Sequence, residues 1–262
     1  MGRLLYKLIV QLRQMGIDVY RFLGYFKEMK LYKQDLKTIR ELLKENNDFP
    51  LGTPKPMLFE RTAASGSASG HYFIQDLYVA RQIFRHQPAK HIDIGSRVDG
   101  FVAHVAVFRE IEVFDIRDQK STVENISFKQ ADMMQLPENL LNYTDSLSCL
   151  HAIEHFGLGR YGDPLDINGH LKAFENIHKI LKKDGIFYFS TPIGKQRIEF
   201  NAHRIFAPKY LLNIFAADYE LLRFSYIDDK GDFYENYNLT EKDLENDLNC
   251  MYGCGIFELK KK

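Results

Sequence analysis

The sequence has little that would mark a special environment or a charged partner. It contains only three cysteines, Cys149, Cys250 and Cys254, and none are in the C-x-x-C spacing of a zinc or redox site. This count argues against a disulfide framework and fits a reducing compartment. Lysine plus arginine equals aspartate plus glutamate, at 35 each, so no overall basic or acidic field indicates nucleic acid as a partner.

Long apolar runs are also missing, and none approaches the roughly 18 residues that a membrane-spanning helix needs. Charges interrupt the apolar residues near the start of the chain, and no small-residue cleavage site follows them, so we expect no signal peptide. Hydrophobic residues nevertheless make up 45% of the chain, enough for a sizeable core. These observations predict a cytoplasmic globular protein.

Residues 1–44 differ from the rest in charge. They carry ten lysines and arginines against four acidic residues, a net charge of +6. Apolar residues at helical spacing predict an amphipathic helix over 5–15, and a second helix is expected over 31–43. We expect these helices to pack on the main domain or to mediate self-association. The alternative is a basic element that attaches the protein peripherally to an anionic membrane.

A linker separates this segment from the remainder. Prolines and glycine interrupt residues 50–56, and residues 63–70 are almost entirely alanine, serine and glycine. The sequence therefore predicts a basic helical extension with its linker over 1–70 and one domain over 71–262.

Residues 71–262 alternate between helical and strand patterns. Helices are expected over 72–84, 100–109, 167–181 and 208–215, and strands over 89–94, 111–116, 126–131, 146–150, 186–190, 219–227 and 255–259. This alternation predicts an α/β fold, doubly wound and Rossmann-like, with a mainly parallel seven-stranded sheet. Such a sheet binds ligands at the carboxyl ends of its strands.

Small and acidic residues occur where three of these strands end. Gly95 follows the first strand, and a glycine at a strand-to-helix turn lets a ligand approach the backbone. Asp115 ends the second strand twenty residues later, a distance suited to binding a ribose diol. Asp132 follows the third strand. Asp115 and Asp132 also have a simpler interpretation, as residues that close a turn. Gln75 and Asp76 either reach the ligand or lie on the solvated face of a helix.

Two phosphate-binding motifs fit poorly. A Walker loop needs a lysine after its second glycine, whereas Phe101 follows Gly100. A dinucleotide fingerprint needs a middle glycine where Arg97 lies.

The ordered series resembles the class I S-adenosylmethionine-dependent methyltransferases. The resemblance covers residues 88–259 and rests on the Asp93-Ile94-Gly95 turn, on Asp115 and Asp132, and on the segments 145–155 and 185–192. Within that class, residues 70–77, 93–104 and 155–164 are similar to a little-characterised bacterial family named only as a domain of unknown function.

The resemblance implies roles for individual residues. The cofactor, S-adenosylmethionine, would lie against Gly95, with its ribose at Asp115, its adenine at Asp132 and its sulfonium above His151. The full implied set of cofactor-binding residues is Asp93, Gly95, Ser96, Arg97, Asp115, Ile116, Asp132, Met133 and His151. Arg97 departs from the family pattern, which has glycine there. Its side chain would swing out, pair with the cofactor's carboxylate, or block the site.

A histidine cluster follows the fourth strand. His151, Glu154 and His155 are spaced so that one helical turn would bring them to one face. His155 is the candidate general base, with Glu154 beside it and His203 as the next candidate. A metal site that includes Asp163 or Asp166, and a purely structural cluster, are the alternatives; we assign no metal ligands.

The expected reaction is methyl transfer to a small-molecule or glycan acceptor. By analogy with the family we expect O-methylation of a sugar hydroxyl in surface-polysaccharide or nucleotide-sugar metabolism. Two rivals remain: a degenerate methyltransferase fold that serves as a binding platform, and a dinucleotide-dependent enzyme.

Overall fold

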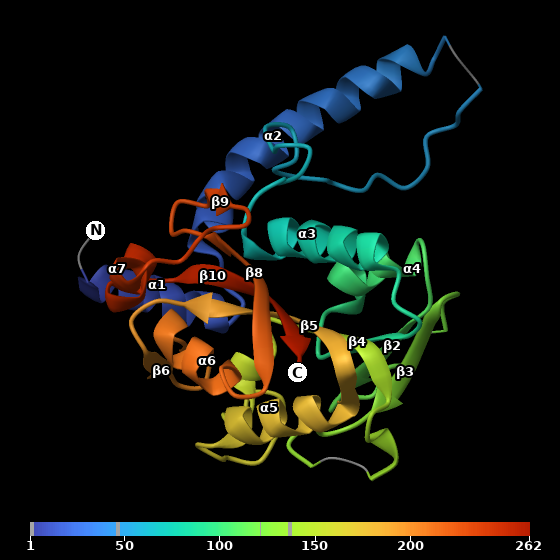
Figure 1. The fold of residues 1–262 in the computed structure, drawn as a ribbon. Helices are drawn as coiled ribbons and strands as arrows, with labels where there is room; N and C mark the ends of the chain where they lie inside the picture. The colour runs from blue at the N-terminus through green and yellow to red at the C-terminus, as the bar shows by residue number, and fades with distance from the viewer. Residues whose placement is uncertain (1–2, 46–47, 121, 136–137) are drawn as a thin grey trace. The chain divides into compact units, whose positions relative to one another are not determined.

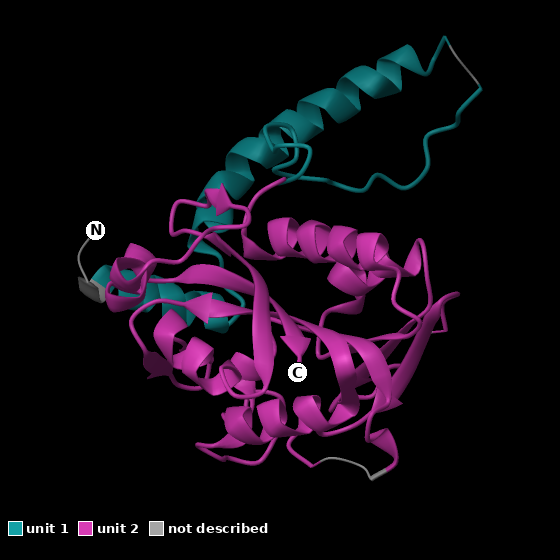
Figure 2. Cartoon of the chain, in the orientation of Figure 1, with its two compact units in different colours: residues 1–67 teal, residues 68–262 magenta. Residues whose placement is uncertain are grey.

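The chain divides into two units, residues 1–67 and 68–262 (Figure 2). The structure is a computed structural model that describes residues 3–45, 48–120, 122–135 and 138–262.

The first unit contains two helices, α1 (Arg3–Gln14) and α2 (Val19–Leu42). Helix α2 is longer than the 31–43 expected, because it includes the aromatic segment before Leu31. Its start is set by Asp18, whose carboxylate accepts hydrogen bonds from the amides of Tyr20 (3.0 Å) and Arg21 (3.1 Å). No residue of α2 is buried. Among the described residues, no helix is long and apolar enough to cross a bilayer.

The second unit is built on an eight-stranded sheet of order β3-β2-β1-β4-β5-β10-β8-β9. Its strands are β1 (His91–Ile94), β2 (Ile111–Asp115), β3 (Ile126–Gln130), β4 (Thr144–Leu150), β5 (Leu181–Ile193), β8 (Tyr219–Ile227), β9 (Phe233–Tyr234) and β10 (Gly253–Lys261). Strands β1 to β5 pair in parallel, and β10 runs antiparallel between β5 and β8. The predicted Rossmann-like α/β fold is confirmed, with the two-residue β9 as an additional strand.

Helices cover both faces of this sheet (Figure 1). Helix α3 (His71–His86) and the short α4 (Ala103–Ala106) lie on one face, and α5 (Gly169–Ile180) and α6 (Pro208–Phe215) on the other. Each face has its own apolar cluster: Val79, Ile83 and Val105 on the first, and Phe174, Ile177 and Phe215 on the second. All six side chains are 6% exposed or less. The central strands β1, β4 and β5 are thereby packed between two layers of helices.

Several expected elements differ in the structure. The helix expected over 100–109 is a π-helical turn, Val98–Val102, followed by α4, because the backbone of Gly100 is not helical. Strand β5 continues through Pro192, whose carbonyl still accepts from the amide of Phe206 (3.0 Å). A hairpin of β6 (Arg197–Glu199) and β7 (His203–Ile205) and a short helix α7 (Glu241–Glu245) were not expected.

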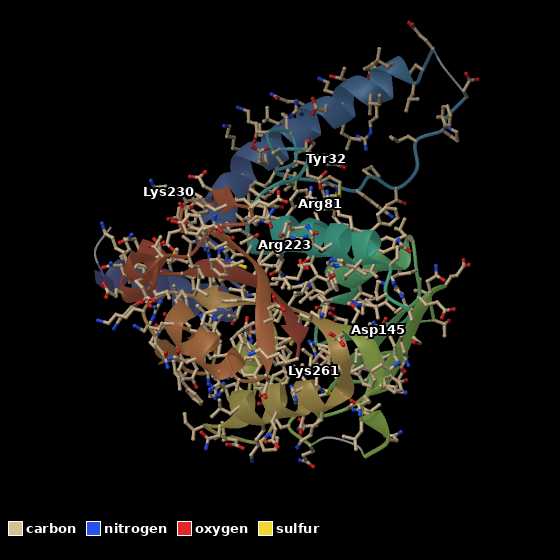
Figure 3. All side chains as sticks on the ribbon, in the orientation of Figure 1. Tyr32, Arg81, Asp145, Arg223, Lys230 and Lys261 are labelled. Atoms are coloured by element: carbon tan, nitrogen blue, oxygen red, sulfur yellow. The ribbon has the colours of Figure 1, made fainter. Side chains whose placement is uncertain are left out.

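Long-range polar contacts join these elements through Asp145, Arg223 and Lys261, which Figure 3 labels. Asp145 accepts hydrogen bonds from the amides of Ala89 and Lys90, both at 2.7 Å, and so ties the entry of β1 to β4. Arg223 of β8 forms an ion pair with Glu258, its register partner on β10 (3.0 Å). The Lys261 ammonium donates to two carbonyls at the end of α5.

Candidate active site

A pocket opens at the carboxyl ends of β1, β2 and β4 and beyond β3. Six of the nine expected cofactor-binding residues line it: Gly95, Asp115, Ile116, Asp132, Met133 and His151. The other lining residues are Ile94, Phe114, Arg117, Ala131, Met134, Ala152, His155, Phe156, Tyr161 and Asp163. The parallel topology thus brings together residues from four separate strand ends.

Gly95 forms the turn after β1. Its φ is +74°, a left-handed conformation that favours glycine, and a Cβ placed there would lie 2.9 Å from the Cβ of Ala152. The turn therefore needs a residue without a side chain and leaves its backbone close to the pocket.

Asp93 and Ser96 support this turn from behind and do not line the pocket. The Asp93 carboxyl accepts hydrogen bonds from the Ser96 amide (2.9 Å), the Ser96 hydroxyl (2.9 Å) and the Ser148 hydroxyl (2.6 Å). Asp93 is fully buried. Burial raises the pKa of its carboxyl to about 7, although these hydrogen bonds oppose the shift.

The guanidinium of Arg97 points away from the pocket. It forms an ion pair with Asp99, at 3.0 Å from Nε and 2.7 Å from Nη2, and its side chain is 73% exposed. In the structure the Arg97 side chain is turned outward, and its pairing with the cofactor's carboxylate stays a prediction. Arg97 neither blocks the pocket nor lines it.

Asp115 lines the pocket with its carboxylate held by Arg117. Its Oδ1 accepts from the Arg117 amide (2.8 Å) and Nε (2.9 Å), and its Oδ2 accepts from Nη2 (2.6 Å). Each carboxylate oxygen can accept two hydrogen bonds, so Oδ2 keeps one lone pair for a ligand hydroxyl. The guanidinium of Arg117 also lies over the ring of Tyr161, 4.5 Å from its centroid.

Asp132 and Met133 form the wall beyond β3. The Asp132 Oδ1 accepts from the Met134 amide (2.8 Å), so the acid closes a turn as well as lining the pocket. Met133 is 2% exposed and adds an apolar surface beside it.

His151 and Glu154 form a buried pair at the end of β4. The backbone of His151 is left-handed (φ +49°) and a 3₁₀ turn, Ile153–His155, follows, so the regular helical turn expected from the spacing is absent. The His151 Nδ1 nevertheless lies 3.0 Å from the Glu154 Oε1. Burial opposes both charges, but Cys254 and Glu154 raise the pKa of His151 to about 10, and His151 lowers that of Glu154.

His155 lines the pocket, and one of its ring nitrogens already forms a hydrogen bond within the protein. Its Nδ1 lies 2.6 Å from the carbonyl oxygen of Ala202. A carbonyl only accepts, so Nδ1 carries the hydrogen and Nε2 holds the lone pair. Burial lowers the pKa of His155, while Glu154, 3.7 Å from Nε2, partly opposes this. The arrangement suits a neutral base whose protonated form is stabilised by a carboxylate.

A glycine-rich loop, residues 157–163, closes one side of the pocket. Asp163 accepts from the amides of Gly157 (2.7 Å), Gly159 (3.2 Å) and Tyr161 (3.2 Å) and so determines its path. The buried guanidinium of Arg204 fixes the base of the loop by donating to the carbonyl of Phe156 (2.6 Å). Asp163 and Asp166, candidates for metal ligands, are held by these amides and by Lys172, respectively.

The remaining sequence candidates lie outside the pocket lining. His203 is on β7, its Nε2 3.3 Å from the Glu199 carboxylate and its ring 6.3 Å from that of His155. Gln75 and Asp76 are buried rather than solvated, and burial raises the pKa of Asp76 to about 6.

Sequence reasoning did not find Arg117 or Tyr161 as pocket residues. Tyr161 lies in a segment that the resemblance had included. For Arg117, the only sequence feature that could have indicated a role in the pocket is its position two residues after Asp115.

Two solved structures similar to this chain are methyltransferases. The 1,6-didemethyltoxoflavin-N1-methyltransferase of Burkholderia thailandensis, solved with its substrate and S-adenosylhomocysteine, shares 13% identity over 72% of this chain and 78% of that chain, with a TM-score of 0.51. An S-adenosylmethionine-dependent methyltransferase of Clostridium acetobutylicum shares 11% identity over 74% of this chain and 93% of that chain, with a TM-score of 0.49. The first likeness agrees with the Rossmann-like methyltransferase fold.

Sequence comparison identifies the family. No curated protein matches the chain in sequence. Residues 102–252 match the family described as "Caenorhabditis protein of unknown function, DUF268". That description names Caenorhabditis, so the bacterial origin expected for the family stays a prediction. The match covers more than half of the chain, which therefore belongs to the DUF268 family of proteins of unknown function.

Proposed function

We propose that this chain is an S-adenosylmethionine-dependent methyltransferase that methylates a hydroxyl group of a small sugar-containing acceptor. The observation that carries the proposal is the pocket itself, in which the glycine turn after β1, the acid ending β2 and the acid following β3 line one cavity. The Burkholderia thailandensis methyltransferase, whose structure contains S-adenosylhomocysteine, supports the same cofactor.

The pocket residues fit such a cofactor. The bare backbone at Gly95 admits a ligand that a Cβ would exclude. Asp115 keeps a free acceptor position for a ribose hydroxyl, and Asp132 and Met133 offer a polar and an apolar contact for adenine. His151 would form the floor beneath the sulfonium. Asp93 and Ser96 would act indirectly, by holding the turn.

The cofactor would supply an electrophilic methyl group, and the protein would align the acceptor and remove its proton. His155 Nε2 is the proposed proton acceptor, because Nδ1 is occupied and the ring lines the pocket. Glu154 would stabilise the resulting imidazolium from 3.7 Å. His203, outside the lining, is the second candidate for the base.

The proposed acceptor is a small molecule that would lie against the loop 157–163, which lines one side of the pocket. The ring of Tyr161 and the carboxylate of Asp163 provide an apolar face and a hydrogen-bond acceptor, a combination suited to a sugar ring. The didemethyltoxoflavin enzyme also acts on a small molecule. Surface-polysaccharide or nucleotide-sugar metabolism remains the proposed setting, and the family analogy is its only support.

The structure gives little support to a binding platform without catalysis. That alternative relied on Arg97 filling the site, whereas Arg97 pairs with Asp99 away from it. The absence of a middle glycine at Arg97 still disfavours a dinucleotide.

Titration calorimetry with S-adenosylmethionine, S-adenosylhomocysteine and NAD distinguishes the three functions. We expect heat with the first two ligands and none with NAD. No heat and no thermal shift at millimolar ligand would reject the enzyme and favour the platform. Transfer of a labelled methyl group from S-adenosylmethionine to nucleotide sugars, compared with amine and thiol acceptors, then tests the acceptor class.

A further inference from the structure

Three side chains of types that commonly bind metal ions lie close together beside the pocket. His71 begins α3, His151 follows β4, and Cys254 is the second residue of β10. Their ligand atoms, one from each side chain, all lie within 4.8 Å of one another. His151 and Cys254 are buried and His71 is partly buried. We propose that these three residues hold a zinc ion.

The separation of the atoms approaches that of a zinc site. The His151 Nε2 lies 3.3 Å from the Cys254 Sγ. Zinc bonds of about 2.1 Å to nitrogen and 2.3 Å to sulfur, at a tetrahedral angle, put these ligands roughly 3.6 Å apart. The rings of His71 and His151 lie 5.6 Å apart between centroids. The His71 ring also stacks on the ring of Tyr252, 5.5 Å between centroids, so zinc binding requires an adjustment of the His71 ring between these two neighbours.

The surroundings of His151 also match a metal ligand. Metal-binding histidines almost always give their second nitrogen's hydrogen to a carboxylate, carbonyl or water. Here the His151 Nδ1 lies 3.0 Å from the Glu154 Oε1, and the Thr191 hydroxyl lies 3.5 Å from Oε2. Glu154 thus directs Nε2 of His151 towards Cys254, and the zinc ion would take the place of the Nε2 proton that the high pKa of His151 otherwise retains.

Two imidazoles and a thiolate favour zinc over hard cations, since calcium and magnesium prefer oxygen ligands. Three protein ligands leave a fourth tetrahedral position for water or for a substrate atom, as in catalytic rather than structural zinc sites. Because His151 also lines the pocket, that position lies next to the site proposed for methyl transfer. The inference needs no assumption about the reaction.

The test measures metal content and ligand identity in the full-length protein. We expect one zinc per chain after equilibration with zinc and removal of the excess. Cobalt substitution should give a sulfur-to-metal charge-transfer band. Cys254→Ser should abolish this band and raise the dissociation constant for zinc at least 100-fold, and His71→Asn should raise it similarly. Glu154→Gln should raise it about 10–100-fold, the usual effect of losing a partner that orients a ligand.

Cys250→Ser is the matched control, since Cys250 is buried but does not belong to the cluster. It should bind zinc and show the cobalt band as the wild type does. Circular dichroism checks that each variant folds. If Cys254→Ser does not fold, His71→Asn, which changes a residue at the start of a helix, still tests the ligand set. Zinc-free folded wild type, or equal zinc affinity in the wild type and in His71→Asn, would overturn the proposal in favour of a simple thiol–imidazole hydrogen bond.

Discussion

The carboxylate of Asp115 both lines the pocket and accepts three hydrogen bonds from Arg117. We expect Asp115→Ala to weaken S-adenosylhomocysteine binding by roughly 1.5–3 kcal/mol, because a hydrogen bond to a charged group is lost. Calorimetry measures this directly. Asp99→Ala removes another acid that pairs with an arginine, but outside the pocket, and should leave the affinity unchanged. Equal affinity in both variants would mean that the ribose is held elsewhere.

His155 is the side chain on which the proposed proton transfer depends. Its replacement by alanine should lower kcat by about 10²–10⁴, the usual contribution of a general base, with little change in cofactor affinity. Since burial lowers the pKa of His155, the wild-type kcat should rise with pH through a midpoint below 6.5. Full turnover in His155→Ala, with the loss occurring in His203→Ala instead, would move the base to His203.

Asp93 makes the stability of the protein depend on pH. Its pKa is about 7 in the folded chain, against 3.8 in the unfolded chain. Both states hold the proton below pH 3.8. Between pH 3.8 and pH 7 the unfolded chain releases the Asp93 proton while the folded chain keeps it. The contribution of Asp93 to the free energy of unfolding therefore falls as pH rises and is lowest above pH 7.

We therefore expect the wild type to lose on the order of 4 kcal/mol relative to Asp93→Asn between pH 4 and pH 8, measured by urea unfolding. His91→Gln is a control of opposite sign. Burial lowers the pKa of His91 to about 3, so the wild type should lose stability relative to that variant as pH falls below 6.5. A difference between wild type and Asp93→Asn that is independent of pH would show that Asp93 is ionised in the folded protein.

At the scale of elements, the loop 157–163 depends on glycines that differ in their surroundings. Gly157 has φ +76°, and a Cβ there would lie 2.0 Å from the Asp166 carbonyl oxygen. Gly162 has φ +84° but no atom within 4 Å of an added Cβ. Gly162→Ala should cost only the backbone strain, about 1 kcal/mol, whereas Gly157→Ala should cost clearly more because the loop must also move.

Thermal unfolding and cofactor titration test this pair. The larger loss of stability in Gly157→Ala should come with weaker cofactor binding, since Phe156 and Tyr161 on either side of it line the pocket. Equal effects of the two variants would show that the loop absorbs the extra methyl group without displacement.

At the scale of the whole molecule, we expect the second unit to fold without the first. Residues 68–262 contain the entire eight-stranded sheet and every residue that lines the pocket. A chain lacking residues 1–67 should keep its thermal unfolding transition and its affinity for S-adenosylhomocysteine. An insoluble truncated chain would mean that the helices complete the main core.

The same truncation tests the role of the basic extension. The exposed apolar residues of α2, such as Phe22, Leu23 and Phe26, and the charge of +6 over residues 1–44 motivate the expectation. If the extension mediates self-association, light scattering should show a smaller assembly after truncation. If it binds membranes, the full chain should sediment with anionic but not with neutral vesicles, and the truncated chain with neither. If neither changes, the extension has another role.

The amino-acid sequence by itself determined the α/β class, the ends of β1 and β4 and the series Gly95, Asp115 and Asp132. Hydrophobic periodicity depends on local geometry, so α6 and β8 have the bounds predicted for them. Parallel strands end at one edge of a sheet, so residues that follow successive strands meet without any knowledge of the packing.

Only the tertiary structure decided which of these side chains reach the pocket. Asp93 is turned inward by Ser148, a residue of another strand, and Arg97 outward by Asp99. The contact between His151 and Cys254 joins residues 103 positions apart, a pairing on which local patterns are silent. The left-handed backbone at His151 likewise replaced the helical turn expected from the spacing. Periodicity reports the spacing of residues within one element, whereas the contacts of Asp93 with Ser148 and of His151 with Cys254 join residues in or directly after separate strands of the sheet.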